Sequence, residues 1–197
     1  MSTERPTSGL NHEQDQQLAS LLSMWDGGPL SAPVFTQIAR IIPQPIVEVV
    51  VTRINNRILE ALLVPRPNDD IVWPGMLHTP GCALRASDYQ REDGNPLNGA
   101  YERIQDEVGN QFAAPPTFVG RLHRTVERGP EVVEIYTAGI ANDAMLKPGC
   151  LWYPMDELAT HPKFIQVQLG HVNMVIAHFR NRLNQASYPV RRHGASL

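Results

Sequence analysis

Apolar residues recur at helical spacing in the first part of the chain. Between residues 11 and 25 they fall on one side of a predicted helix, which the Gly-Gly-Pro sequence at 27–29 ends. A second helix is predicted over residues 31–42, with Ser31 as its N-cap and two prolines just beyond its end. Residues 1–45 are therefore predicted to form an N-terminal tail and a helical appendage.

The pattern changes to β-branched apolar runs from residue 46 onward. Two runs, at 46–52 and 58–64, flank an Asn-Asn turn signal and predict a β-hairpin. A polar loop is expected over 88–99. The other predicted elements are a helix over 100–108, strands over 118–126, 131–140 and 151–154, and a long amphipathic helix over 168–185.

The composition fits one globular domain with short appendages. The chain has 197 residues, of which 42% are hydrophobic, and a formal net charge of −3. Residues 46–186 form the predicted domain, and 187–197 a flexible C-terminal tail. The N-terminus lacks the apolar core of a signal peptide, and no apolar run is long enough for a membrane span. A cytoplasmic location is predicted, without membrane contact or bulk nucleic-acid binding.

The two cysteines add little to the picture. Cys82 and Cys150 are far apart in the sequence and form no Cys-x-x-Cys pair. This spacing excludes a zinc ribbon and a disulfide framework. Because no export signal is recognised, both thiols are expected to be reduced.

The most informative stretch for chemistry is 77–112. There a Pro80-Gly81 turn precedes a predicted helix that contains Asp106 and Glu107. Carboxylates on a helix just past a tight turn can hold a hard divalent cation, and Mg²⁺ then bridges to the phosphates of a substrate. The alternative is that the two acidic residues form a solvated helix face.

This stretch resembles the signature of the Nudix hydrolase family, G-x5-E-x7-R-E-U-x-E-E-x-G-U, in which U is a bulky apolar residue. Gly81 matches the usual Pro-Gly lead-in, Asp88 stands at the first glutamate, and Asp106 and Glu107 match the acidic pair. Gly109 matches the later glycine, and it is also predicted to end the helix as its C′ residue.

The resemblance covers residues 46–185 and implies both a fold and an activity. The fold is α/β (α+β), a Nudix-like mixed β-sheet flanked by helices, here with an N-terminal helical appendage. The activity is cleavage of a pyrophosphate bond in a nucleoside-diphosphate-linked substrate, with Mg²⁺ or Mn²⁺ as cofactor. The implied catalytic and metal-binding residues are Glu107, Asp106 and Glu102, and the implied structural turns are at Gly81 and Gly109.

Four departures from the signature leave its activity open. Cys82 replaces the signature glycine, the closing apolar position is polar, and the gap from Asp88 to Glu102 is fourteen residues, six more than in the signature. The Arg-Glu pair is reversed to Glu102-Arg103, and an ion pair between Arg103 and Glu107 would compete with a metal ion. We expect slow hydrolysis at most, and we expect that exchanging residues 102 and 103 would restore activity.

Residues outside the signature offer further candidates. Arg121 and Arg124 are candidate substrate-binding residues that could face a phosphate, or they could belong to an exposed polar sheet face. Candidate substitutes for a missing ligand or base are Glu92, Asp93, Glu131 and Glu134.

Three functional hypotheses therefore stand. The first is a slow Nudix-type hydrolase with a small nucleotide-like substrate, whose identity no motif indicates. The second is a catalytically impaired Nudix-like domain that binds a nucleotide-like ligand or a protein partner. The third is a dimerising protein in which residues 11–42 cover a partner surface, as in a homodimer.

Overall fold

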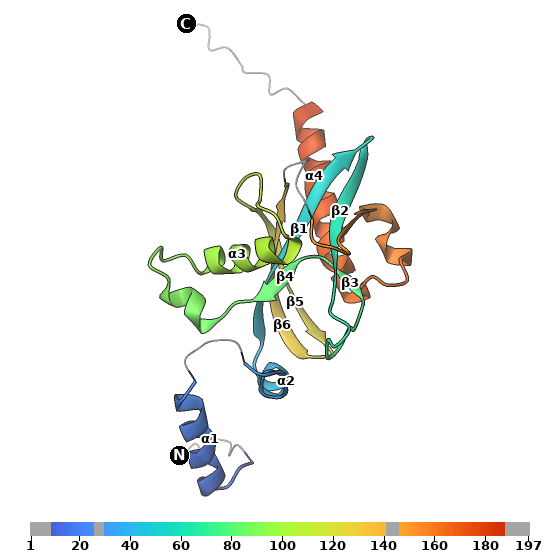
Figure 1. Cartoon of the computed structure of the whole chain (residues 1–197). Coiled ribbons are helices and arrows are strands. Elements are labelled where there is room, and N and C mark those ends of the chain that lie inside the picture. Colours follow the sequence, from blue (N-terminus) through green and yellow to red (C-terminus); the bar gives the residue numbers. More distant parts are fainter. Residues whose placement is uncertain (1–8, 26–29, 141–145, 188–197) are drawn as a thin grey trace, which may run out of the picture.

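A computed structural model describes residues 9–25, 30–140 and 146–187, and a mixed β-sheet forms its centre (Figure 1). The strand order is β3-β2-β1-β6-β5, with β4 also paired to β1 and β7 to β2. Among the strands of the described residues, only β1 and β6 pair in parallel. This confirms the predicted mixed sheet. The strands are β1 (Gln44–Asn55), β2 (Ile58–Pro65), β3 (Leu77–His78), β4 (Gly81–Ala83), β5 (Thr117–Val126), β6 (Gly129–Ala138) and β7 (Leu151–Pro154).

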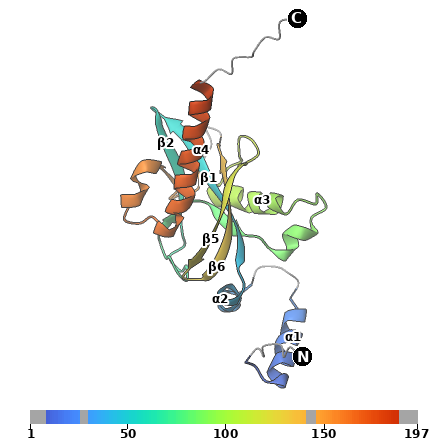
Figure 2. The same ribbon diagram turned by 180° about the vertical axis from the view of Figure 1, so that it is seen from behind.

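Helices cover both faces of the sheet, with α3 on one side and α4 on the other (Figures 1 and 2). Among the described helices, none is long and apolar enough to cross a membrane. The helices are α1 (His12–Ser23), α2 (Ala32–Ile41), α3 (Pro96–Val108) and α4 (Leu169–Ser187), with the 3-10 helices η1 (Ala86–Gln90), η2 (Met155–Thr160) and η3 (Gln166–Gln168).

The central strand β1 has a nearly continuous apolar sequence because both of its faces are buried. Val47, Val49 and Val51 are fully buried in the cluster beneath α3. Ile46 and Val50 point to the opposite cluster beneath α4, as the two-residue period of a strand requires. Because both faces of β1 are covered, apolar residues occupy nearly every position.

Several boundaries differ from the prediction, among them the starts of α3 and β1. Helix α3 begins at Pro96, four residues before the predicted start, because the Asn95 side chain accepts a hydrogen bond from the backbone N–H of Leu97. Proline at the first helical position needs no hydrogen-bond partner for its nitrogen. Strand β1 begins at Gln44, which pairs with Glu131 of β6.

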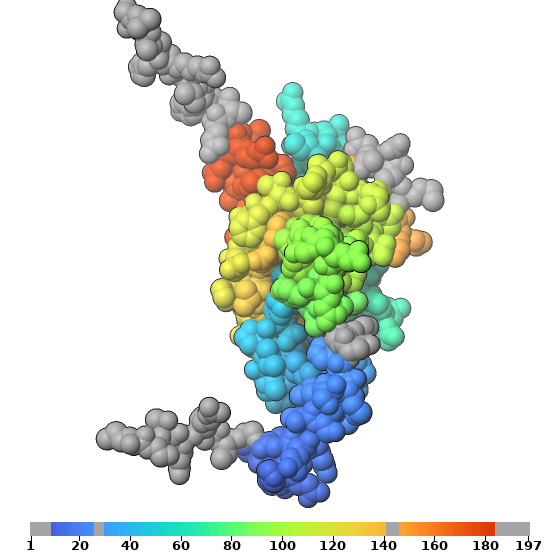
Figure 3. Space-filling view, turned by 90° about the vertical axis from the view of Figure 1, so that its left-hand side faces the viewer, coloured from blue at the N-terminus to red at the C-terminus, as the bar shows by residue number. Residues whose placement is uncertain are grey.

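The two predicted N-terminal helices form, but they differ in how they pack. Helix α1 has no buried residue and lies apart from the sheet, at the lower end of Figure 3. Its leucines 18, 21 and 22 are exposed. In α2 the predicted N-cap Ser31 has the expected position, yet its side chain makes no capping hydrogen bond. A homodimer through residues 11–42 stays a prediction. The predicted break at 27–29 and residues 188–197 of the predicted C-terminal tail lie outside the described residues, whereas Ser187 ends α4.

Helix α2 packs closely against the turn between β5 and β6. Ala39 of α2 is fully buried, and Gly129 in the turn has a backbone φ of +136°. A Cβ atom on residue 129 would collide with the carbonyl oxygen of Ala39. Glycine is therefore required at this position both for its conformation and for the docking of α2.

Replacing Gly129 by alanine is expected to lower the free energy of unfolding by about 2–3 kcal/mol, because the side chain strains the turn and displaces α2. The matched control is Gly94→Ala. Gly94 also has positive φ, but its Cβ would meet no described atom within 4 Å, so the expected cost is only about 1 kcal/mol. Urea unfolding measures the free energy of unfolding of both variants. Equal losses of stability in the two would contradict the close packing of α2.

Candidate functional site

The candidate site forms where the central strand β1 changes partners. Residues 46–48 of β1 pair with β4, whereas the last part of β1 pairs with β2. Since β3 pairs with β2, the short Thr79-Pro80 connection between β3 and β4 crosses the gap between the separating strands. This arrangement brings Glu48, His78 and Gly81 close together.

Glu107, in the last turn of α3, faces this connection. Its carboxylate accepts a hydrogen bond from the N–H of Gly81 at 3.2 Å and lies 3.2 Å from Nε2 of the buried His78. A Cβ atom on residue 81 would lie 2.6 Å from a carboxylate oxygen of Glu48, which explains why glycine occupies this position. The structure therefore joins the Gly81 turn to Glu107.

The other two proposed metal ligands lie elsewhere on α3. Glu102 pairs with Arg91 through two contacts of 2.7 and 2.9 Å on the surface. Asp106 is exposed and borders a surface hollow of about 640 Å³ beside Lys147. Of the three, Glu107 is the one that contacts the Gly81 turn. Within residues 9–25, 30–140 and 146–187, no three His, Cys, Asp or Glu side chains are grouped to hold a metal ion.

Arg103 does not pair with Glu107, so the predicted competition for the metal-binding carboxylate was wrong. The guanidinium donates hydrogen bonds of 2.6 and 2.8 Å to the buried Asp88 and one of 3.1 Å to the Ala83 carbonyl. Burial raises the pKa of Asp88, but hydrogen bonds from Arg103 and the Arg85 N–H outweigh it and hold this pKa below its usual value. The Asp88 carboxylate offers two acceptor oxygens in the planar geometry that a guanidinium prefers.

Glu92 and Asp93 belong to the loop ahead of α3. Asp93 accepts hydrogen bonds from the Asn95 backbone N–H at 3.0 Å and from the Asn98 amide at 3.2 Å. Glu92 is exposed. Asp93 therefore stabilises its own loop.

Arg121 and Arg124 lie on opposite faces of the sheet, because they are three residues apart along one strand. Arg121 pairs with Glu134 on the α3 side. Arg124 pairs with Glu131 at 2.6 Å on the α4 side, where Arg128 also contacts Glu131 at 2.7 Å. The two predicted substrate-binding arginines therefore do not share one site.

A cavity of about 140 Å³ opens beside Glu48, between the separated strands. Its lining includes Arg66, Arg124, Arg128 and Trp73. The guanidinium carbons of Arg66 and Arg128 lie 5.8 and 5.1 Å from the centre of the Trp73 ring. Arginines next to an aromatic ring suit a ligand that combines an anionic group with a planar one.

Glu48 is a buried carboxylate in the wall of this cavity. Burial raises its pKa to about 7, although the charge of Arg124 opposes the shift. Its oxygens accept hydrogen bonds from the Thr79 hydroxyl at 3.1 Å and the Gln168 amide at 2.9 Å. Nearby, burial and the charge of Arg124 lower the pKa of His171 to about 3, so this imidazole is neutral.

Sequence reasoning missed Glu48, His78 and Trp73. Glu48 had a usable signal, because it is the single charged residue in the apolar run of β1, and a buried charge requires partners. His78 and Trp73 had none, since the short strand β3 and the loop before it are placed by the whole fold.

No protein-family model matches the sequence, and no curated protein matches it either. Solved structures do match. A NUDIX hydrolase from Nitrosomonas europaea is 16% identical with a TM-score of 0.52, covering 70% of this chain and 90% of that one. The NUDIX domain of Shewanella oneidensis NrtR, complexed with ADP ribose, is 17% identical with a TM-score of 0.53, covering 84% and 97%. A mutT/nudix family protein from Listeria innocua is 13% identical with a TM-score of 0.54, covering 73% and 99%.

These likenesses show that the chain has the Nudix fold. They confirm the resemblance first seen in the Pro80-Gly81 turn and the acidic helix that follows it. At such low sequence identity, they do not assign functions to individual residues of this chain.

Proposed function

We propose that the protein binds a nucleotide-like diphosphate ligand in the cavity beside Glu48 and hydrolyses its pyrophosphate bond slowly. The observation behind this proposal is that the lining of one cavity contains three arginines, Trp73 and Gly81, whose N–H is bonded to Glu107. A cavity of about 140 Å³ accommodates part of such a ligand, and the rest would extend into solvent. The ADP ribose complex of the NrtR Nudix domain supports the ligand class.

The residues at the Gly81 turn fit a weakly held Mg²⁺ or Mn²⁺. Mg²⁺ is commonly bound by one or two carboxylates, with water and substrate phosphates as its other ligands. Glu107, 29% exposed, would be the protein ligand at this turn, since Asp106 borders the separate hollow beside Lys147. A bound cation would neutralise charge on the diphosphate. The chain itself would orient the ligand through Arg66 and Trp73.

The alternative is binding without hydrolysis. Its specific support is the reversed Glu102-Arg103 pair. Arg103 occupies the position at which the signature has its first helical carboxylate, and its guanidinium is hydrogen-bonded to Asp88. Glu102 forms an ion pair with Arg91. A site with so few carboxylates could retain a ligand yet cleave it poorly.

Titration calorimetry with ADP-ribose tests the proposal. We expect Arg66→Gln to weaken binding about tenfold, because a hydrogen bond to a charged group contributes about 1.5–3 kcal/mol. Arg180→Gln, on the exposed surface of α4, is the matched control and should bind as the native protein does. Glu107→Gln should remove the additional affinity that Mg²⁺ confers and leave binding in EDTA unchanged.

Product analysis then separates the two functions. Slow release of AMP that requires Mg²⁺ and is lost in Glu107→Gln supports the hydrolase. Binding without any release of AMP supports the alternative. Equal affinities of the native protein and Arg66→Gln would place the ligand outside this cavity and contradict both.

A further inference from the structure

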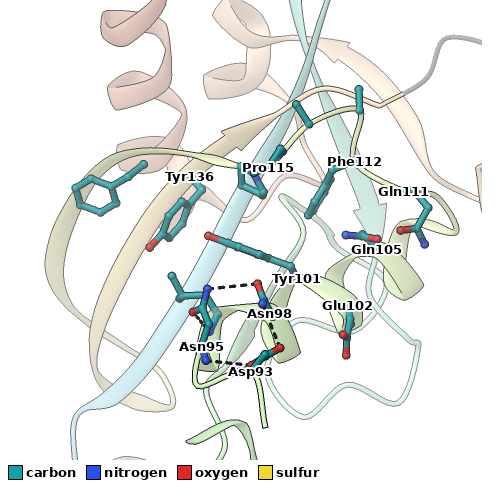
Figure 4. A pocket seen from close by; sticks show the side chains of 15 residues that line it. Asp93, Asn95, Asn98, Tyr101, Glu102, Gln105, Gln111, Phe112, Pro115 and Tyr136 are labelled. Carbon is teal, nitrogen blue, oxygen red and sulfur yellow. Dashed lines mark hydrogen bonds between the residues drawn. The ribbon is translucent and has the colours of Figure 1, made fainter. Parts of the chain in front are cut away.

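A second, larger cavity of about 860 Å³ lies on the other flank of α3 (Figure 4). Tyr101 and Gln105 line it from the helix, and Phe112 and Pro115 line it from the loop that follows. Its residues are distinct from those of the arginine-lined cavity, and it does not include Glu107. It therefore takes no part in the proposed nucleotide site.

Four aromatic rings form one wall of this cavity. Tyr101 stands at 80° to both Phe112 and Tyr136, with ring centres 6.1 and 5.6 Å apart, and Phe118 contacts Tyr136 at 5.4 Å. In Figure 4 the hydroxyl of Tyr101 points toward Tyr136. Because successive rings are nearly perpendicular, they present faces in different directions, and the face of an aromatic ring attracts cations.

The Tyr136 phenol is held in its neutral form. Burial and the neighbouring carboxylate of Glu134 raise its pKa, and its hydroxyl donates a hydrogen bond of 2.9 Å to Glu134. A phenol that donates to a carboxylate has a more electron-rich ring. This arrangement strengthens the attraction of the ring for a positive charge.

The charged residues that line the cavity also favour a cation. Asp93 and Glu102 line the cavity, and among the described residues that line it there is no Arg, Lys or His. Both acids pair with Arg91, at 3.2 and 2.7 Å, so one guanidinium is shared between two carboxylates. Counted together with Glu134 and Arg121, which pair beside Tyr136, the local balance is one negative charge, which disfavours a phosphate and favours a cation.

We propose that this cavity binds a compact organic cation, namely an alkylated ammonium group on a small molecule. The methyl groups would contact the four rings, and Asp93 and Glu102 would balance the charge. The side-chain amides of Asn98, Gln105 and Gln111 would bond to polar groups elsewhere on the ligand. This site goes beyond the proposed nucleotide function and does not depend on it.

Choline and its uncharged isostere 3,3-dimethylbutan-1-ol are the probes. Amide NMR shifts of the full chain should report choline binding at residues 105–113, with a Kd of about 1–10 mM, as few exposed cation–π contacts allow. The isostere should bind at least about fivefold more weakly, because it has the same shape without the charge. Equal binding of the two probes, or binding of neither, would overturn the proposal.

Matched substitutions locate the site. Phe118→Ala removes a ring that is 52% exposed, so the fold tolerates the change, and Tyr89→Ala is the control, a 65% exposed ring outside the cavity. Glu102→Gln removes lining charge, and Glu157→Gln is its control on η2. We expect Phe118→Ala and Glu102→Gln each to weaken choline binding about threefold, and the controls to leave it unchanged. Choline binding that neither cavity variant weakens would contradict the assignment. Affinity for ADP-ribose should not change in Phe118→Ala, Tyr89→Ala or Glu157→Gln.

Discussion

Arg103→Met is expected to lower the free energy of unfolding by about 3–4 kcal/mol, because it leaves the buried carboxylate of Asp88 without its cation. Asp88 is 4% exposed and receives two hydrogen bonds from Arg103. The same guanidinium also bonds the Ala83 carbonyl next to the Gly81 turn. The substitution should therefore also loosen the segment that positions Glu107.

Urea unfolding at several pH values measures this effect. The pKa of Asp88 is below its usual value in the folded chain, so the ion pair stabilises the protein above about pH 4 and this contribution is lost as the pH falls further. The difference between native and Arg103→Met should accordingly shrink in acid. Arg91→Met, which breaks the exposed pair with Glu102, is the control and should change stability little. A comparable loss in both variants would be evidence against a special role of Asp88.

The same geometry reverses one expectation drawn from the sequence. Exchanging the two residues, Glu102→Arg with Arg103→Glu, was expected to restore the signature order and raise activity. The exchange would instead place a second carboxylate against the buried Asp88, and like charges at that distance repel. We now expect this double variant to be destabilised and no more active than the native protein.

Glu48→Gln is expected to raise the free energy of unfolding at pH 8 by about 2–3 kcal/mol and to leave it unchanged at pH 4.5. The pKa of Glu48 is about 7 in the folded chain, against an ordinary value of 4.5. Between these values the folded state binds a proton that the unfolded state does not, so native stability falls as the pH rises. Glutamine resembles the protonated acid: its carbonyl oxygen can accept from the Gln168 amide, and its NH2 group can donate to the Thr79 hydroxyl oxygen.

The measurement compares urea unfolding of both proteins from pH 4.5 to 8. Several charged or titratable groups face Glu48, namely His78 from β3, Arg124 from β5 and His171 from α4. His171 acts in the opposite sense, because its lowered pKa makes the folded state lose stability as the pH falls below about 6.5. That contribution is common to both proteins and cancels in the difference. Glu157→Gln should follow the native curve. Parallel curves for Glu48→Gln and native would show that Glu48 is ionised throughout.

The sequence predicted the elements well where the signal was local. The apolar period of β1 and β2, the turn between them and the stripe on α4 depend on residues a few positions apart. Leu183 falls on that stripe by its spacing, yet it is 66% exposed, because the helix extends past the edge of the sheet that it covers.

The site was less predictable, because distant residues assemble it. Gln168 and Glu48 are hydrogen-bonded although 120 positions separate them. The partner of Arg103 depended on η1, which forms within a stretch that reads as a polar loop. The sequence indicated a turn followed by an acidic helix, but it could not tell which carboxylate contacts the turn or which carboxylates already had a cation.

The parallel pairing of β1 with β6 has a consequence for how the chain folds. Val49 lies opposite Tyr136, so the central strand acquires this neighbour only after most of the chain has been synthesised. Contacts between such distant segments form slowly, because closing a long loop costs entropy before any contact repays it. Until then the β6-facing edge of the run Ile46–Val51, which has a single charge at Glu48, is open to other chains. Aggregation during synthesis should therefore begin at β1.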